Sequence, residues 1–381
     1  MASPWRAGGR WGTRRNRLLA ALSVVVIGLV AASALVLRPS PSASSGRQLA
    51  SGHNRAPATS KTVHHGAHAP AGVRGGANRL DHGVVVTGTV GPAANDGTGI
   101  PPGFVPEPLP AGVTEVTATM KVGQLVRTYE TFRPSKAPSS RIPALVVLHG
   151  SGVPLWLEVE RDGLLPLVAQ GKLVLVYPDG YLRTWNAGVC CGAAALAGVD
   201  DVGFISQVVD VVARTKNVST VDLAGFSNGG RMAYRMVCTD PRLVKAFVVI
   251  DAVAAMDCAP GRAVPLLQID GTQDAIVAYD SGDTPHVVGS FVEPSATQQA
   301  AAWSRRDGCS GDVTSRSMGN MELLAWLHCA DGTAVQFATY VGLEHGWPQG
   351  GPGTPSAADE LWSFINNPLS VPPPGTLPAH L

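Results

Sequence analysis

The sequence predicts an α/β fold with a mostly parallel central sheet, helices on both faces of the sheet and no large cap domain. The chain has 381 residues, of which 45% are hydrophobic and 15% charged, so it can bury an extensive core. From residue 115 onward, short β-branched runs alternate with segments of helical periodicity. The runs ALVVLHG and KLVLVYPDG are continuously apolar, which is typical of parallel strands buried on both faces.

The predicted elements alternate in type along most of this region. We expect strands at 114–120, 124–132, 144–150, 172–180, 220–226, 246–253, 264–271, 321–329 and 334–342. We expect helices at 162–170, 202–216, 229–238, 295–308 and 356–367. Asp200 or Asp201 caps the second of these helices, and the last two strands form a terminal hairpin around the sequence ADGT.

The N-terminal segment 1–38 predicts export. Five arginines precede an uncharged apolar stretch at 18–37, which is about 20 residues long and can span a bilayer as a signal anchor. A shorter apolar core at 18–30, followed by an A-x-A site at 32–34, fits a cleaved signal peptide equally well. Both interpretations place the rest of the chain outside the cytoplasm, either secreted or anchored to the membrane.

Composition divides the remaining chain into three parts. Residues 39–114 are rich in Pro, Ala, Gly, Ser and Thr and predict a disordered tether, with one short β-like piece at 83–90. Residues 115–368 carry the predicted catalytic domain, and residues 369–381 form a Pro-rich tail. For the histidines of the tether we favour a solvated linker over a metal site.

The charge distribution argues against nucleic acid as a partner. The formal net charge is +1, but the basic excess lies in the first 115 residues and the remainder is mildly acidic. An acidic surface repels phosphate backbones, and the sequence has no basic stripe with interleaved aromatic residues.

Six cysteines predict disulfide bonds in an oxidising compartment. None has C-x-x-C spacing, so we expect no zinc site, and the sequence predicts no metal and no organic cofactor. Cys190 and Cys191 are adjacent and are expected to bond to different partners. Cys309 and Cys329 flank one short segment and can pair with each other.

The stretch DLAGFSNGGRMAYRM contains the candidate nucleophile, Ser227. Gly225, Ser227 and Gly229 have G-x-S-x-G spacing between a predicted strand and a predicted helix. A sharp strand-to-helix turn of this kind presents a serine hydroxyl free of the backbone, and the glycines let the chain pack closely enough to form it. The helix N-terminus adds positive potential where an oxyanion develops.

A serine nucleophile needs a base and an orienting acid, which we expect further along the chain. Asp274 follows the strand at 264–271, at the sheet edge where catalytic side chains gather, and we prefer it to Asp270, which lies within the strand. His345 lies in a Gly-flanked loop after the last strand and is the predicted base. His149 precedes the serine and is expected to shape the oxyanion loop instead.

The predicted oxyanion hole needs two backbone N–H donors. One is the N–H of Asn228, directly after the nucleophile. The other comes from the loop after the strand at 144–150, where we favour the N–H of Ser151 and keep that of Gly152 as the alternative.

Several motifs together resemble the secreted polyhydroxybutyrate depolymerase and feruloyl esterase-like α/β-hydrolases. The motifs are VVLHGSG, VYPDG, WNAGVCCG, DDVGF, GFSNGGRMAYRMVC, DGTQD and EHGWP, and the resemblance covers about residues 120–366. It implies the α/β-hydrolase fold, a triad of Ser227, Asp274 and His345, and carboxylic esters of polymers or plant phenolics as substrates.

The resemblance also implies a substrate site near WNAG and EHGWP. Trp185 and Asn186 border the acyl pocket in this interpretation, or Trp185 packs beneath a disulfide-rich loop. Trp347 walls the site or anchors the loop. The chain departs from the family pattern at Asp270, where a histidine is usual, and at Glu344 before the base. An extra carboxylate can shift the pKa of the base, so these departures bear on specificity more than on catalysis.

The sequence therefore predicts an exported serine esterase that acts on an ester substrate, polymeric in one interpretation, through an acyl-enzyme intermediate. A serine peptidase or an acyltransferase on the same fold is an alternative, because one fold can host several activities. A non-catalytic cell-wall-binding protein is the third. The membrane is a partner only if the segment 1–38 stays uncleaved.

Overall fold

The structure, a computed structural model, describes residues 85–87, 107–288, 291–311 and 313–371. The predicted export segment, most of the tether and most of the tail lie outside these residues. Within the described ranges, no helix is both long enough and apolar enough to cross a membrane.

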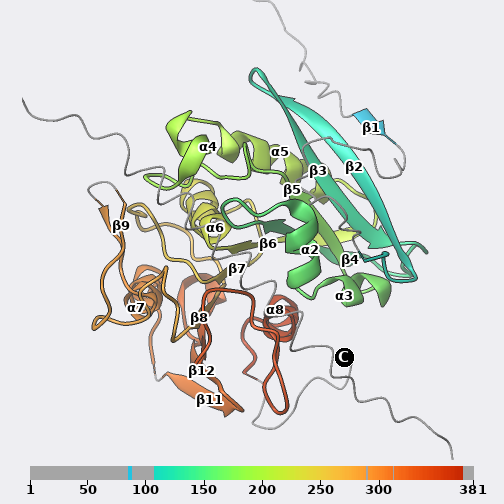
Figure 1. The fold of residues 1–381 in the computed structure, drawn as a ribbon. Coiled ribbons are helices and arrows are strands. Elements are labelled where there is room, and N and C mark those ends of the chain that lie inside the picture. Colours follow the sequence, from blue (N-terminus) through green and yellow to red (C-terminus); the bar gives the residue numbers. More distant parts are fainter. Residues whose placement is uncertain (1–84, 88–106, 289–290, 312, 372–381) are drawn as a thin grey trace, which may run out of the picture.

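The described residues form one large mixed sheet with an α/β-hydrolase topology (Figure 1). Its eleven strands follow the order β1-β2-β3-β5-β4-β6-β7-β8-β13-β12-β11. The strands are β1 (Val85–Thr87), β2 (Val113–Val122), β3 (Leu125–Pro134), β4 (Ile142–Leu148), β5 (Val174–Pro178), β6 (Val218–Phe226), β7 (Phe247–Ile250), β8 (Leu266–Gly271), β11 (Thr314–Met318), β12 (Met321–Trp326) and β13 (Val335–Tyr340). The central strands from β5 to β13 pair in parallel, and antiparallel strands complete both edges.

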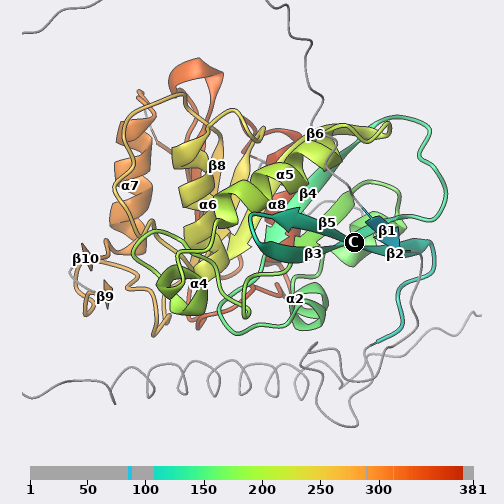
Figure 2. The ribbon, with the colours of Figure 1, turned by 90° about the horizontal axis from the view of Figure 1, so that it is seen from above.

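Helices cover both faces of the sheet. One layer consists of α5 (Asp201–Ala213), α6 (Asn228–Thr239) and α7 (Ala296–Arg306). The other layer consists of α2 (Leu155–Arg161), α3 (Leu165–Ala169) and α8 (Ala357–Asn366). In Figure 2, α7, α6 and α5 lie in a row in front of the sheet, with α8 behind them.

The continuously apolar strands are buried on both faces, as their sequence predicts. In β4, Val146 and Leu148 pack in the cluster that contains α5 and α6, while Leu145 and Val147 pack in the cluster of α3 and α8. All four side chains are fully buried. Burying each of them stabilises the fold by roughly 1.5–3 kcal/mol relative to an exposed side chain, which is why this strand stays at the centre of the sheet.

Most predicted elements are found close to their predicted bounds, and the differences have local causes. The helix expected at 162–170 is shorter and begins later, as α3 at Leu165–Ala169, because Gly163 has a φ of 72° and the Asp162 carboxylate accepts the N–H of Leu164 at 2.9 Å. The preceding helix α2 lies outside the predicted range and was not predicted. The β-like piece in the tether is β1, which pairs with β2. The sequence did not predict the short α4 (Gly192–Leu196), the polar edge strand β11 or the small hairpin of β9 (Val287–Val288) and β10 (Phe291–Val292).

The disulfide bonds correct one expectation. Cys309 pairs with Cys329, as their spacing allows, and Cys238 pairs with Cys258. Cys190 pairs with Cys191, so the expectation that these adjacent residues bond to different partners is wrong. The other four cysteines form two disulfide bonds with one another, so no other cysteine is available to Cys190 or Cys191.

Candidate active site

Ser227 occupies a strained turn between β6 and α6. Its φ of 54° and ψ of −118° are rare for a residue with a side chain, and such strain is concentrated at functional sites. A Cβ on Gly225 would collide with the carbonyl of Gly229, and one on Gly229 would collide with the carbonyl of Leu148. Both glycines of the G-x-S-x-G spacing are therefore needed for the turn to form. The Ser227 N–H donates to the carbonyl of Ile250 at 2.9 Å, which fixes the turn to β7.

His345 and Asp274 meet at the carboxyl ends of β13 and β8. The Nδ1–H of His345 donates to Oδ2 of Asp274 at 2.7 Å. The other oxygen of Asp274, Oδ1, accepts the N–H groups of Ile276 at 2.6 Å and Val277 at 2.9 Å. These backbone donors hold the carboxylate in place.

The second ring nitrogen of His345 is left available. Its Nε2 is buried and has no hydrogen-bond partner among the described residues. The imidazole ring lies against the ring of Phe226, the neighbour of Ser227, with 4.8 Å between the ring centroids. With Nδ1 donating to Asp274, Nε2 carries the lone pair that a general base uses.

Asp270 does not contribute to this pair. Its Oδ2 accepts the Nε2–H of Gln268 at 2.7 Å, and its side chain is buried within β8. The structure brings Asp274, rather than Asp270, to His345.

Asp251 is a third carboxylate at this edge that sequence analysis missed. It follows β7 directly, has a φ of 46° and is buried. Its Oδ2 lies 4.0 Å from Nδ1 of His345. Burial raises the pKa of Asp251 well above its usual value, and the charges of Asp274 and Asp270 raise it further. Its position after the apolar run AFVVI, at a parallel strand end, is the signal that could have found it.

Asp251, Asp274 and His345 lie close enough together for their donor atoms to suit a metal ion. Their geometry favours proton transfer instead, since Nδ1 of His345 already bonds to Asp274. Asp251 accepts two backbone N–H groups, from Gly271 at 3.1 Å and Gly346 at 2.6 Å.

The oxyanion loop after β4 leaves the N–H of Ser151 unused. The N–H of Gly152 donates to the carbonyl of Arg183 at 2.8 Å, so it is not available to a ligand. The N–H groups of Ser151 and Asn228 have no protein acceptor in the part of the chain that the structure describes. Of the two residues that the sequence left open, the geometry favours Ser151 as the partner of Asn228.

His149 fixes the shape of the oxyanion loop. Its Nδ1–H donates to the carbonyl of Gly150 at 2.8 Å, and its Nε2 accepts the N–H of Gly180 at 2.9 Å. Burial lowers the pKa of His149 to about 4, with the charge of Arg161 among the smaller causes. The imidazole is therefore neutral at pH 7, with one nitrogen donating and the other accepting.

The side chain of Asn228 holds Trp185. Its Oδ1 accepts the Trp185 N–H at 2.7 Å, and its Nδ2–H donates to the Trp185 carbonyl at 3.1 Å. The indole Nε1–H of Trp185 donates to the carbonyl of His149 at 2.9 Å. Trp185 has no exposed surface, so of the two roles considered for it, packing beneath the loop fits its position.

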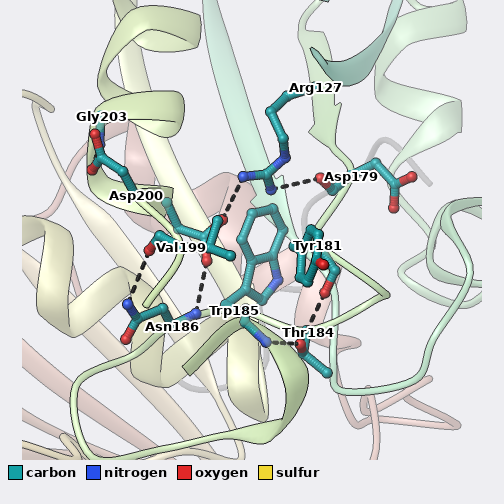
Figure 3. A network of polar contacts seen from close by, with 12 residues as sticks. Arg127, Asp179, Tyr181, Thr184, Trp185, Asn186, Val199, Asp200 and Gly203 are labelled. Atoms are coloured by element: carbon teal, nitrogen blue, oxygen red, sulfur yellow. Dashed lines mark hydrogen bonds and ion pairs between the residues drawn. The ribbon is translucent and has the colours of Figure 1, made fainter. Parts of the chain in front are cut away.

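A buried network fastens the segment around Asn186 to the sheet (Figure 3). Arg127 on β3 donates to Oδ1 of Asp201 at 2.8 Å and to the carbonyl of Asp179 at 2.9 Å. The other oxygen of Asp201 accepts the N–H of Asn186 at 2.8 Å, while the Asn186 side chain donates to the carbonyl of Val199 at 2.9 Å. The WNAG and DDVGF motifs are thus two ends of one structural connection.

Trp347 anchors the loop of His345 to α2. Its Nε1–H donates to Oε1 of Glu158 at 2.9 Å, and Arg161 donates to the other oxygen of Glu158 at 2.5 Å. The guanidinium of Arg161 lies 4.2 Å above the ring of Phe226. Trp347 is buried, and anchoring is the role that its contacts fit. The buried ion pair of Glu158 and Arg161 therefore lies between the nucleophile turn and the base loop.

Known proteins with similar sequences include feruloyl esterases. Feruloyl esterase B from Piromyces equi is 27% identical over 192 residues, which are 48% of this chain and 33% of that protein. A probable feruloyl esterase C from Aspergillus clavatus is 26% identical over 222 residues, which are 58% of this chain and 71% of that protein. The chain thus spans only a third of the first relative. No family model matches the chain.

Solved esterase structures align with parts of the chain. Acetyl xylan esterase from Aspergillus awamori has a TM-score of 0.42 and 15% sequence identity, covering 58% of this chain and 89% of that one. A thermostable esterase has a TM-score of 0.37 and 15% identity, covering 50% of this chain and 51% of that one.

Proposed function

Because the chain is a feruloyl esterase-like α/β-hydrolase, we propose that it is a serine esterase that hydrolyses carboxylic esters through an acyl-enzyme intermediate. One observation supports this above all others. His345 is held by Asp274 at 2.7 Å through Nδ1, and its Nε2 is left without a partner beside the end of β6, where Ser227 follows. This is the arrangement that a serine nucleophile needs for its base.

In the proposed mechanism, the Oγ of Ser227 attacks the ester carbonyl while Nε2 of His345 takes the hydroxyl proton. The Asp274 carboxylate stabilises the imidazolium that forms. The N–H groups of Ser151 and Asn228 donate to the oxyanion of the tetrahedral intermediate. His345 then returns the proton to the leaving alcohol, and water hydrolyses the acyl-enzyme by the same steps.

The proposed substrates are esters of the feruloyl, acetyl or polyester type. The feruloyl esterases among the relatives support the first type, and the motif resemblance supports the polyester type. We further propose that the enzyme acts outside the cytoplasm, because the apolar stretch at 18–37 has the length and flanking charge of an export segment.

The test is hydrolysis of p-nitrophenyl acetate and p-nitrophenyl butyrate by Ser227→Ala. We expect the rate to fall at least about 10⁴-fold, because the nucleophile is lost. Ser219→Ala is the matched control, since it removes an exposed hydroxyl near the start of β6, away from the candidate site, and we expect it to retain activity. Wild-type rates in Ser227→Ala protein with intact disulfides would refute the proposed mechanism.

A further inference from the structure

Two carboxylates lie near Nδ1 of His345, although the proposed mechanism uses only one of them. Asp274 bonds to His345, and Asp270 is turned toward Gln268. Oδ2 of Asp251 lies 4.0 Å from Nδ1 of His345. Asp251 has no role in the chemistry described so far. It comes from β7, whereas Asp274 follows β8.

Asp251 joins the two segments that carry the acid and the base. Its Oδ1 accepts the N–H of Gly271, at the end of β8 just before Asp274. Its Oδ2 accepts the N–H of Gly346, directly after His345. One side chain thus spaces the turn of the acid from the loop of the base. The chain passes closely here, since a Cβ on Gly271 would collide with the carbonyl of Leu343.

The same oxygen that holds Gly346 faces the imidazole. Oδ2 of Asp251 is 2.6 Å from the Gly346 nitrogen and 4.0 Å from Nδ1 of His345. A shift of about 1 Å would bring Nδ1 within hydrogen-bond distance, which is about 3 Å. His345 therefore has two carboxylates on the side of Nδ1. Asp274 is hydrogen-bonded to Nδ1, and Asp251 lies just beyond hydrogen-bond distance.

On the basis of the proposed function, we propose that Asp251 is a second positioning acid for His345. It fixes the loop of His345 through the N–H of Gly346, and it accepts the hydrogen bond from Nδ1–H of His345 when Asp274 cannot. It acts through His345 and does not touch the substrate. The assignment deepens the proposed triad without changing the reaction.

Electrostatics explain why Asp251 is held in reserve while Asp274 is present. Burial is the largest cause of the raised pKa of Asp251, and the negative charge of Asp274 is the next. Replacing Asp274 with a neutral residue removes that repulsion, so the pKa of Asp251 falls and its charged form becomes more favourable. Asp270 also faces this cluster, and the same two effects raise its pKa. The imidazolium would then gain its counter-ion from Asp251.

A double-mutant cycle tests the proposal, with kcat and KM measured on p-nitrophenyl butyrate. Asp251→Asn alone should lower kcat less than about 10-fold, since its amide oxygen can still accept the Gly346 N–H. Asp274→Asn alone should lower kcat about 10²-fold to 10³-fold. The double variant should lose at least a further 10²-fold relative to Asp274→Asn, with KM little changed, because no acid then remains for His345.

Asp270→Asn is the matched control, because it removes a buried carboxyl of the same cluster that is bonded to Gln268. It should change kcat by the same factor with and without Asp274. Thermal unfolding and the rate of fluorophosphonate labelling of Ser227 accompany each variant. If the Asp251→Asn protein is unfolded, Asp251→Ser takes its place, because a hydroxyl can accept the Gly346 N–H but cannot carry charge.

Equal losses from the Asp251 substitution in both backgrounds would overturn the proposal and leave Asp251 a structural residue. This failure differs from failure of the proposed function. In the latter case Ser227→Ala would hydrolyse the ester at the wild-type rate, and substitutions at Asp274 and Asp251 would leave kcat unchanged, alone and together.

Discussion

The site has two sides that are built in different ways. The base side consists of Asp274, His345 and Asp251, whose reactive atoms belong to side chains at the ends of β8, β13 and β7. On the oxyanion side, the loop at 149–152 and Asn228 offer backbone N–H groups. Buried side chains, those of His149, Trp185 and Asn228 itself, support these N–H groups from beneath.

The comparison shows which substitutions separate activity from stability. A reactive side chain can be removed while the backbone around it stays in place, so activity falls and the fold remains. A backbone N–H cannot be removed in this way. It is displaced only when its support is lost, and because that support is part of the core, activity and stability should fall together.

The largest expected effect is on the base side. We expect His345→Ala to lower kcat by about 10⁴-fold to 10⁶-fold, because no other group can take the proton of Ser227. The free energy of unfolding should change by less than about 1.5 kcal/mol, since the side chain makes one strong hydrogen bond. Ester hydrolysis and urea unfolding measure the two quantities. A loss of several kcal/mol in stability would break the distinction between the two sides.

The next effect concerns the buried network that holds the segment around Asn186, next to Trp185 on the oxyanion side. Arg127→Met should destabilise the fold by about 3–5 kcal/mol, because it leaves the Asp201 carboxylate buried without its partner. Arg214→Met is the control. The Arg214 and Asp210 side chains are 72% and 61% exposed, so breaking their ion pair should change stability by less than about 1 kcal/mol. Urea unfolding of both variants compares them. A small effect at Arg127 would mean that the network in Figure 3 is not what holds the segment around Asn186.

His149 makes the oxyanion side sensitive to acid. Its folded-state pKa of about 4 lies below the usual value of 6.5, so the unfolded chain binds more protons between these pH values. Its contribution to stability is present above pH 6.5 and decreases as the pH falls toward 4, by up to about 3 kcal/mol. Other buried groups act in the opposite direction, since burial raises the pKa of Asp162 to about 8.

The His149→Asn variant isolates this contribution. Its amide can keep the donation to Gly150 but does not titrate. Subtracting its unfolding free energy from that of the wild type, at several pH values between 4 and 7.5, should give a difference that grows with pH. A flat difference would contradict the neutral, buried imidazole.

The smallest expected effect concerns the turn that contacts the oxyanion loop. Leu182 has a φ of 47° and is 71% exposed, so it combines backbone strain with little burial. Leu182→Asn should raise stability by about 0.5 kcal/mol, because Asn tolerates the left-handed conformation better. Activity should stay within about twofold of wild type, because the turn bonds to Gly152 through the backbone of Arg183. A melting curve and an ester assay suffice, and a tenfold loss of activity would mean that Leu182 itself contacts the substrate.

The sequence predicted the strands of the parallel core well, because a continuous apolar run such as that of β4 is stable as a strand only where both faces of the sheet are covered. It also predicted the turn of Ser227, where glycine spacing has a direct steric meaning. Asp274 and His345 could be proposed because each follows a recognisable strand. These features depend on neighbours in sequence.

Features that depend on contacts between distant segments were beyond sequence reasoning. Asp251 follows a recognisable strand, but its contacts with Gly271 and Gly346 join segments that are distant in the sequence. The burial of Trp185 follows from its bonds to Asn228, 43 residues later. The late start of the helix expected at 162–170 depends on the positive φ of Gly163, a conformation that glycine adopts readily and that the sequence does not reveal.

Asn228 serves two purposes with different parts of one residue, since its N–H is the proposed oxyanion donor while its side chain secures Trp185. For evolution this is a constraint on divergence. Any lineage that replaces this asparagine must rebuild the segment around Trp185 in the same step, whereas the exposed tip at Leu182 can drift freely. Variation in substrate preference should therefore accumulate at the rim of the site, and laboratory libraries should begin there.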